Sequence, residues 1–440
     1  MNHLPIHKDI VKRNIEKLQL RNLDEASIRE IVFLANHIQE ESGVEFIRME
    51  MGIPGIPALK EGIVAQQKAL EEGVASQYPP IEGIPELKEQ SKKFVKNFLD
   101  IDVDADHCVP TVGSMQATYA AFTTCNKLDN QKDTTLFIDP GFPVQKQQHM
   151  VMGHRYESFD VYHFRGEKLR EKLESYLKNG NIHSLIYSNP NNPSWICLTD
   201  EELQIIGELA TQYDVIVLED LAYFGMDFRN GYGIPAEAPY QPTVAKYTDN
   251  YMLFISSSKI FSYAGERIGL IVMSNKLAQR KYDKLHQEWN ISTFGGAIIY
   301  RALYSLSSGT SHSAQCAMAQ MLKVVNDKKI NFLDNLDEYR HRASVMKSIF
   351  LSNGFKLIYD KDLNRDVGDG FYFTIAYPGM DGATLLEALL HYGISAITLK
   401  NTGSTQEGLR ACVSHVSRKQ LEILKERIEK FQSQYRQLSK

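Results

Sequence analysis

The stretch SSSKIFSYAGERIG, residues 256–269, places one lysine between three serines and an arginine. It follows the apolar run YMLFI, residues 251–255, which is typical of a buried strand. Residues 268–273 are apolar again. Lys259 is therefore expected where a buried strand reaches the surface, with Arg267 a short distance along the chain.

A lysine in such a position can carry out covalent chemistry. Desolvation disfavours its charged form and lowers its pKa unless the ammonium is paired, and a lysine with a lowered pKa can form a Schiff base with an aldehyde. Serines together with an arginine suit a phosphate. This pattern predicts pyridoxal phosphate (PLP), an aldehyde cofactor with a phosphate. On its own, Lys259 could instead be a surface lysine after an ordinary strand.

The composition excludes several classes of protein. A chain of 440 residues exceeds one typical core, so two domains are expected. A net charge of −5 argues against nucleic-acid binding. The five cysteines are scattered without a CxxC spacing, so neither a disulfide framework nor a metal site is indicated. The sequence has no secretory signal pattern and no long apolar stretch, so we expect no membrane span and a cytoplasmic location.

Three more short apolar runs are each followed by polar or turn residues and then by a helical pattern. These runs are 134–138, 185–187 and 215–218. Such alternation predicts an α/β fold with a mostly parallel, doubly wound sheet. Ligands of such sheets bind beyond the carboxyl ends of the strands. The polar segments that begin at Asp139, Ser188 and Glu219 all fall there.

Weaker signals come from glycine- and proline-containing segments. A short strand at 108–111 leads into Val112-Gly113-Ser114-Met115, a pattern that can cradle a phosphate with backbone N–H groups. Gly52 begins a GIPGIP segment, which is either a close approach to a ligand or only a turn. Tyr78 precedes two prolines that favour an extended, exposed segment.

The C-terminal part reads as a smaller α+β domain. A helical pattern covers 313–350 with a possible break at 334–338, and further helices are predicted at 383–392 and 418–438. Strand-like runs occur at 356–358, 370–376 and 408–413. We expect an N-terminal arm and part of the small domain over 1–55, a large PLP-binding domain over 56–315, and a C-terminal small domain over 316–440.

Taken in this order, the motifs resemble the fold-type I PLP-dependent aminotransferases of class I/II, a family similar to aspartate aminotransferase. The resemblance begins near residue 25 and rests on Gly52, Tyr78, Gly83, Gly113-Ser114-Met115, Phe142, Asn192-Pro193-Ser194, Asp220, Tyr223, Ser256, Lys259, Arg267 and Arg410. It implies a large domain with a mainly parallel seven-stranded sheet and a smaller α+β domain built from both termini.

The resemblance also implies a role for each residue. Lys259 would hold PLP as an internal aldimine and then move a proton between the substrate Cα and the cofactor C4′. Asp220 would pair with the pyridine nitrogen, and Tyr223 and Asn192 would bond the ring's 3′-oxygen. Phe142 would stack on the ring face, and Tyr78 would reach the phosphate of the partner subunit. The phosphate in the same subunit would be bound by Ser114, Met115, Ser256 and Arg267. The substrate carboxylate would be bound by Arg410, Gly52 and Asn192.

The implied function is a ping-pong transfer of an amino group from an L-amino acid to a 2-oxo acid, in a homodimer with shared sites. A PLP-dependent lyase or decarboxylase, such as a carbon–sulfur lyase, stays open on the same fold. A PLP-binding regulator is disfavoured because residues 1–25 are too few for a DNA-binding domain. Each of three residues also has a structural alternative. Asp220 could cap a helix, Arg410 could form a surface ion pair, and Phe142 could belong to the hydrophobic core.

Two segments depart from the family pattern. The family's Asn-Pro-Thr-Gly reads Asn192-Pro193-Ser194-Trp195, which is expected to change the local backbone and can change the pocket wall. Residues 399–403, LKNTG, replace the usual Pro-Gly before the carboxylate-binding arginine. Arg280 and Arg301 are the candidates for a second arginine, but neither can be assigned, so aspartate specificity is not supported.

Overall fold

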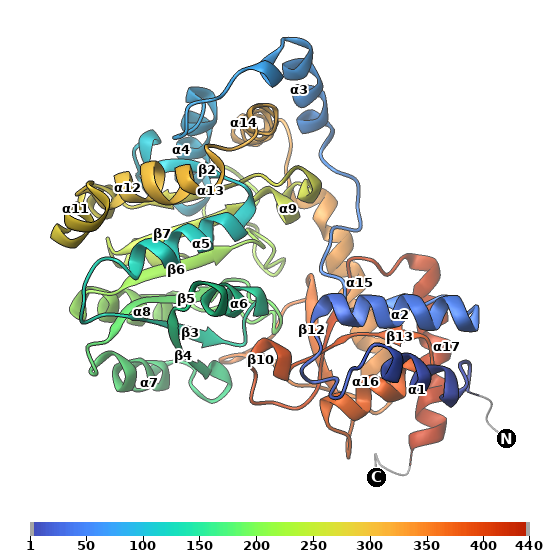
Figure 1. The fold of residues 1–440 in the computed structure, drawn as a ribbon. Helices are drawn as coiled ribbons and strands as arrows, with labels where there is room; N and C mark the ends of the chain where they lie inside the picture. Colours follow the sequence, from blue (N-terminus) through green and yellow to red (C-terminus); the bar gives the residue numbers. More distant parts are fainter. Residues whose placement is uncertain (1–3, 437–440) are drawn as a thin grey trace.

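The computed structural model describes residues 4–436, which form two lobes joined along one side (Figure 1). The larger lobe is built on a seven-stranded sheet and the smaller on a four-stranded sheet. The predicted domain ranges stay a prediction. Their outermost residues, 1–3 and 437–440, lie outside the described residues, and the boundary at 315/316 falls inside helix α14 (His312–Asn326), which packs on α3 (Lys60–Glu71) and α4 (Pro85–Leu99).

The seven-stranded sheet is mainly parallel, as predicted. Its order is β2-β8-β7-β6-β5-β3-β4, and only β8 runs antiparallel to its neighbours. The strands are β2 (Cys108–Thr111), β3 (Thr134–Asp139), β4 (Arg155–Asp160), β5 (Ile182–Ser188), β6 (Ile216–Leu221), β7 (Tyr251–Ser256) and β8 (Gly269–Met273). The apolar runs recognised in the sequence therefore lie side by side in one sheet.

Both faces of this sheet are buried, which explains the continuous apolar runs. In β7, Met252 and Phe254 belong to one core cluster, whereas Leu253 and Ile255 belong to the other. This alternation follows the two-residue period of a strand. The first cluster packs under α5 (Gly113–Cys125) and the helical segments after β8, and the second packs under α7 (Glu167–Leu177) and α8 (Asp200–Gln212).

The smaller lobe is made from both ends of the chain. Its sheet has the order β14-β15-β12-β9, with strands β9 (Lys356–Leu357), β12 (Tyr372–Ala376), β14 (Ile397–Thr398) and β15 (Leu409–Cys412). A separate parallel pair joins β1 (Ile47–Arg48) to β13 (Ile394–Ser395), and so ties the N-terminal segment to the C-terminal part. The helices of this lobe are α1 (Lys8–Lys17), α2 (Ile28–Ser42), α15 (Leu333–Leu351), α16 (Gly382–Leu390) and α17 (Arg418–Tyr435).

Two helix predictions differ from the structure. The break expected at 334–338 is wrong, because α15 runs through those residues and the helical pattern is interrupted at 327–332 instead. The interruption begins where Lys328 adopts a left-handed backbone, φ 59°, which an α-helix excludes. The last helix begins at Arg418 as predicted and ends at Tyr435; residues 437 and 438 of the predicted range lie outside the described residues.

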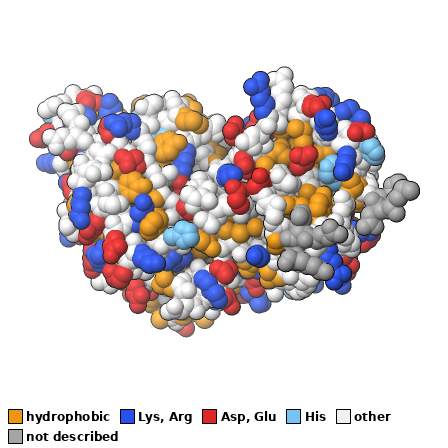
Figure 2. All heavy atoms as spheres, turned by 90° about the horizontal axis from the view of Figure 1, so that it is seen from below, with side chains coloured by type: hydrophobic (Ala, Val, Ile, Leu, Met, Phe, Trp, Pro, Cys, Tyr) orange, Lys and Arg blue, Asp and Glu red, His pale blue; other side chains and the backbone are white. Residues whose placement is uncertain are grey.

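The surface carries both signs of charge. On the face seen in Figure 2, lysine and arginine are interspersed with aspartate and glutamate, without a large patch of one sign. Within residues 4–436, no helix has the length and apolar character needed to cross a membrane. The same part of the chain contains no group of three or more His, Cys, Asp or Glu side chains that could hold a metal ion.

Candidate active site

A cavity of about 400 Å³ opens at the carboxyl ends of the parallel strands, between the two lobes. Every predicted site residue except Tyr78 lines it, namely Gly52, Ser114, Met115, Phe142, Asn192, Asp220, Tyr223, Ser256, Lys259, Arg267 and Arg410. These residues come from segments far apart in the sequence. The fold therefore assembles them where ligands of parallel sheets usually bind.

Lys259 lies in a short helical turn directly after β7. Ser256 caps this turn by accepting a hydrogen bond from Ser258 N, at 3.1 Å. The lysine Nζ donates to the carbonyl oxygen of Gly52 and lies 5.4 Å from the centroid of the Phe371 ring. Burial lowers the pKa of Lys259 to about 8, and the nearby Arg267 adds to that effect. A lysine poised in this way is a competent nucleophile near neutral pH.

The part of the cavity next to the start of α5 is suited to an anion. The hydroxyl of Ser114 is buried at the start of α5 and has no hydrogen-bond partner among the described residues. The guanidinium of Arg267 lies against Gly113, whose φ is +66° and where an added Cβ would overlap it. A helix N-terminus, a free hydroxyl and an arginine together form a phosphate-binding arrangement.

A buried carboxylate also lines the cavity. Asp220, at the end of β6, accepts a hydrogen bond from Ala222 N at 3.1 Å and one from Gln145 Nε2 at 3.0 Å. Burial raises the pKa of Asp220 to about 6. A cationic partner in the cavity would favour the ionised form, so this carboxylate is suited to a protonated ring nitrogen.

Aromatic residues form the wall beside Asp220. Phe142 stands just before α6 (Pro143–Met152) and lines the cavity. Tyr223 is buried and shares a hydrogen bond of 2.8 Å with the hydroxyl of Tyr372. Trp195 adopts φ 62° and is fully buried, but it does not line the cavity. The altered backbone expected at Trp195 is present, and its indole packs behind the wall, edge-on to Tyr223.

Arg410 contributes a buried guanidinium to the cavity from the smaller lobe. It is 1% exposed on β15, so a surface ion pair is wrong for this residue. Its guanidinium donates to Glu50 O and lies 3.4 Å from Asn192 Oδ1, while its Nε is buried without a partner among the described residues. A buried arginine with spare donors can bind a carboxylate bidentately.

Three candidate residues, one tyrosine and two arginines, lie outside this cavity. Tyr78 is 90% exposed and lies outside the cavity of its own chain. Arg280 forms an ion pair with Asp214, and Arg301 donates to the backbone carbonyl of Trp289. Neither arginine lines the cavity, so neither reads a side-chain carboxylate in this chain.

Sequence reasoning missed several residues of the cavity wall, namely Ile28, Ile53, Gln145 and Tyr372, whereas it placed Ser188 at the ligand-binding edge without giving it a role. Gln145 lies inside a helix, and Tyr372 starts an apolar strand that reads as core. No local motif marks either residue. Only the position of Gln145 shortly after Phe142 could have suggested that it faces the same cavity.

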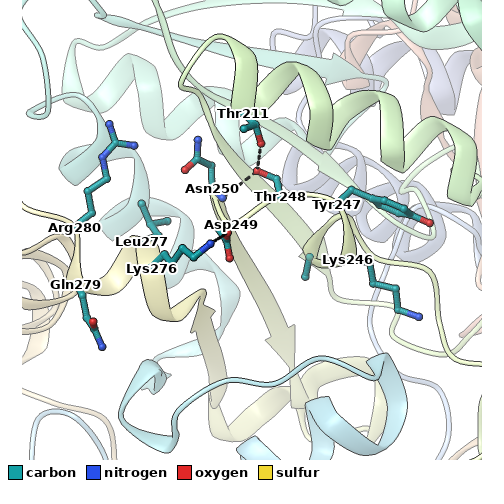
Figure 3. A pocket seen from close by; sticks show the side chains of 11 residues that line it. Thr211, Lys246, Tyr247, Thr248, Asp249, Asn250, Lys276, Leu277, Gln279 and Arg280 are labelled. Atoms are coloured by element: carbon teal, nitrogen blue, oxygen red, sulfur yellow. Dashed lines mark hydrogen bonds and ion pairs between the residues drawn. The ribbon is translucent and has the colours of Figure 1, made fainter.

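A second pocket lies at the opposite, amino-terminal edge of the sheet, next to the loop before β7 (Figure 3). Lys276 is paired with Asp249 at 2.6 Å and Arg280 with Asp214 at 2.5 Å, while the ammonium of Lys246 lies 5.4 Å from the centroid of the Tyr240 ring. Thr211 and Thr248 are hydrogen-bonded to each other at 2.8 Å. The groups suited to chemistry are therefore in the first cavity.

Comparison with known proteins agrees with this geometry. A family model described as aminotransferase class I and II matches residues 46–428. The chain belongs to this family. The family is PLP-dependent, so the chain is an aminotransferase of the PLP-dependent fold type I. This finding disfavours the lyase alternative.

Individual relatives are distant. An aspartate aminotransferase of Pyrococcus horikoshii is 25% identical over 307 residues, which cover 69% of this chain and 72% of the relative. A probable aspartate aminotransferase of Methanocaldococcus jannaschii is 26% identical, over 58% of this chain and 63% of the relative.

Solved structures share the fold. The aspartate aminotransferase from Thermus thermophilus with maleate has a TM-score of 0.73 at 17% identity, covering 95% of this chain and 98% of its own. An alanine aminotransferase from Pyrococcus furiosus has a TM-score of 0.75 at 20% identity, covering 95% and 99%. One structure is an aspartate aminotransferase and the other an alanine aminotransferase, so the fold does not indicate a substrate.

Proposed function

We propose that this aminotransferase binds PLP covalently through Lys259 and transfers an amino group from an L-amino acid to a 2-oxo acid in ping-pong order. The observation that carries the proposal is the gathering of these groups around one cavity. The anion-binding arrangement of Ser114 and Arg267, the nucleophilic Lys259, the buried Asp220 and the buried Arg410 all line it.

The residues fit the cofactor. The free Ser114 hydroxyl, Arg267 and the start of α5, which carries the backbone N–H of Met115, would hold the phosphate, together with Ser256. Asp220 would keep the ring nitrogen protonated, and the bound ring would supply an electron sink for the substrate Cα. Phe142 would cover the ring face.

The remaining groups would bind and orient the substrate. Arg410 and the backbone of Gly52 would take the α-carboxylate, with Asn192 between the carboxylate and the ring. Tyr223 and Asn192 would donate to the ring oxygen. Lys259, once released by the incoming amine, has a pKa near neutrality and would move the proton at Cα.

We also propose that the active form is a homodimer in the cytoplasm. Tyr78 is almost fully exposed and precedes Pro79 and Pro80, and exposed apolar side chains such as Val64, Leu70 and Tyr304 accompany it on the larger lobe. A second subunit that covers these exposed side chains would place Tyr78 at the phosphate site of that second subunit. All five cysteines are unpaired, which supports a reducing compartment.

The test is a screen with purified protein. Wild type should bind PLP with a visible absorption band, and borohydride reduction followed by peptide mapping should place the pyridoxyl group on Lys259. Amino donors should bleach the band, and a 2-oxo acid should restore it. Labelling of a different lysine would refute the site, and product formed without any oxo acid would show a lyase instead.

A further inference from the structure

A pair of buried phenols joins the two lobes inside the candidate site. Tyr223 follows β6 of the larger lobe, and Tyr372 begins β12 of the smaller lobe. Their hydroxyl oxygens are 2.8 Å apart, and the residues are 4% and 1% exposed. A buried phenol needs a hydrogen-bond partner, and here each phenol is the partner of the other.

Tyr372 also faces Arg410. The guanidinium carbon of Arg410 lies 4.9 Å from the centroid of the Tyr372 ring. In the β12–β15 pair, Tyr372 stands opposite Cys412 and Arg410 opposite Thr374, so both side chains project from the same face. A cation over an aromatic ring at this distance is held in a preferred orientation.

The surrounding chain leaves room for Tyr372 in this pose. An added Cβ at Gly52 would overlap the Tyr372 hydroxyl. The indole of Trp195 packs edge-on against both phenols, with centroid distances of 5.5 Å to Tyr223 and 6.3 Å to Tyr372. Steric contacts on two sides therefore fix the phenol pair.

We propose that Tyr372 is a positioning residue that orients Arg410 with its ring and Tyr223 with its hydroxyl. The proposal rests on the proposed function of the cavity. A phenol can donate and accept at once. If Tyr372 donates to Tyr223, the hydrogen of Tyr223 is directed at the cofactor's ring oxygen, and the two bonds strengthen each other.

The charged groups of the same cavity are Asp220, Lys259, Arg267 and Arg410. Arg410 and Cys412 of β15 are the ionisable groups that act on both phenols. Burial raises the pKa of Tyr223 and of Tyr372 far above neutrality. Both therefore remain protonated donors over the pH range in which the enzyme can be assayed.

Two variants of the PLP-loaded enzyme separate the two contacts. Tyr372→Phe keeps the ring, so KM for the amino donor should stay within about twofold, but the pH midpoint of the cofactor's visible absorption should rise by about half a unit. The midpoint rises because a weaker donor stabilises the anionic ring oxygen less. Tyr372→Leu also removes the ring and should raise KM about fivefold.

Tyr377→Phe is the matched control. Tyr377 lies just beyond the same strand and is 1% exposed, and its hydroxyl has no partner among the described residues. The Tyr377→Phe enzyme should have the same pH midpoint of cofactor absorption and the same KM for the amino donor as wild type. In a Tyr223→Phe background, Tyr372→Phe should add no further shift of the midpoint.

Two results would overturn the proposal while leaving the proposed function intact. One is a Tyr372→Phe enzyme that titrates as wild type, and the other is an unchanged KM in a Tyr372→Leu enzyme with native circular dichroism. A wild-type protein without any cofactor band would instead refute the proposed function, and the positioning role with it.

Discussion

Lys259 is the residue on which the chemistry depends, and its burial affects stability as well as reactivity. The folded-state pKa of about 8 lies below the ordinary lysine pKa of 10.5. Between these two pH values the unfolded chain binds more protons than the folded chain, so stability rises with pH there. Below pH 8 the protein bears the whole energetic penalty of holding this lysine.

Lys259→Met should therefore stabilise the protein measured without PLP. At pH 7 the free energy of unfolding should exceed that of wild type by up to about 3 kcal/mol, the energy equivalent of the lowered pKa. The difference should shrink as the pH approaches 10, because the folded lysine is already neutral there and the lysine of the unfolded chain begins to lose its proton as well. Urea unfolding at the two pH values measures it.

Lys12→Met is the control for a simple gain in hydrophobicity. The Lys12 side chain is 76% exposed, so its substitution should give no pH-dependent difference from wild type. A Lys259→Met protein no more stable than wild type at pH 7 would show that the lysine is adequately solvated in the cavity.

At the scale of elements, the sequence predicted those strands and site segments that a local residue pattern encodes. Short apolar runs followed by polar residues identified β3, β5, β6 and β7, because strands buried on both faces need continuous apolar residues. The polar residues after them were assigned to the site for the same reason. Tyr372 was missed because its role arises from pairing between β12 and β15, which no local spacing encodes.

The helix break was misplaced for a related reason. Asp334 lies in the first turn of α15, which begins at Leu333, and an acidic residue is favourable there. Glu338 lies within the helix and forms an i,i+4 ion pair with Arg342 at 3.0 Å, so neither residue interrupts it. Trp195 shows the opposite case. The missing glycine was visible in the sequence, but the burial of the indole depends on Gly370, far away in the chain.

The contact between Trp195 and Gly370 gives an element-scale prediction. An added Cβ at Gly370 would overlap the indole ring, so Gly370→Ala should destabilise the protein by about 2–3 kcal/mol. In a Trp195→Gly background the same substitution should cost much less, because the overlapping ring is gone. Thermal unfolding of the four proteins in the cycle measures this coupling.

Gly265→Ala serves as the matched control for the loss of a glycine, because an added Cβ there meets nothing within 4 Å. It should change stability little in either background. Equal effects of Gly370→Ala with and without the indole would mean that the two segments do not pack as described.

At the scale of the whole molecule, the cavity depends on contacts between lobes. Asp160 ends β4 of the larger sheet and accepts hydrogen bonds from Tyr359 Oη at 2.8 Å, Ser404 Oγ at 3.0 Å and Thr405 N at 2.8 Å. Gly141 N donates to Thr402 O at 2.9 Å, directly before Phe142. Tyr359 and the residues from Thr402 to Thr405, which include the end of the unusual 399–403 segment, therefore anchor the lobe that carries Arg410 against the lobe that carries Lys259.

The last prediction concerns Tyr78, which we expect to complete the phosphate site of a second subunit. Tyr78 is exposed and extended, and it lies outside its own cavity. In the proposed dimer it donates one hydrogen bond to the partner's phosphate, a charge-assisted contact of about 1.5–3 kcal/mol. Tyr78→Phe should therefore weaken PLP binding about tenfold to hundredfold and leave the dimer intact.

Hybrid dimers test the sharing directly. A Tyr78→Phe subunit retains Lys259 but lends its neighbour a defective contact, whereas a Lys259→Ala subunit is inactive but lends a native Tyr78. A dimer of the two contains one site with both native groups, so at limiting PLP the mixture should regain affinity and activity over either parent. Native mass spectrometry establishes subunit exchange. Exchanged dimers that bind PLP no better than their parents would mean that each chain completes its own site. In that case the Tyr78→Phe subunit lacks its tyrosine and the Lys259→Ala subunit lacks its lysine, so both sites of the hybrid are defective.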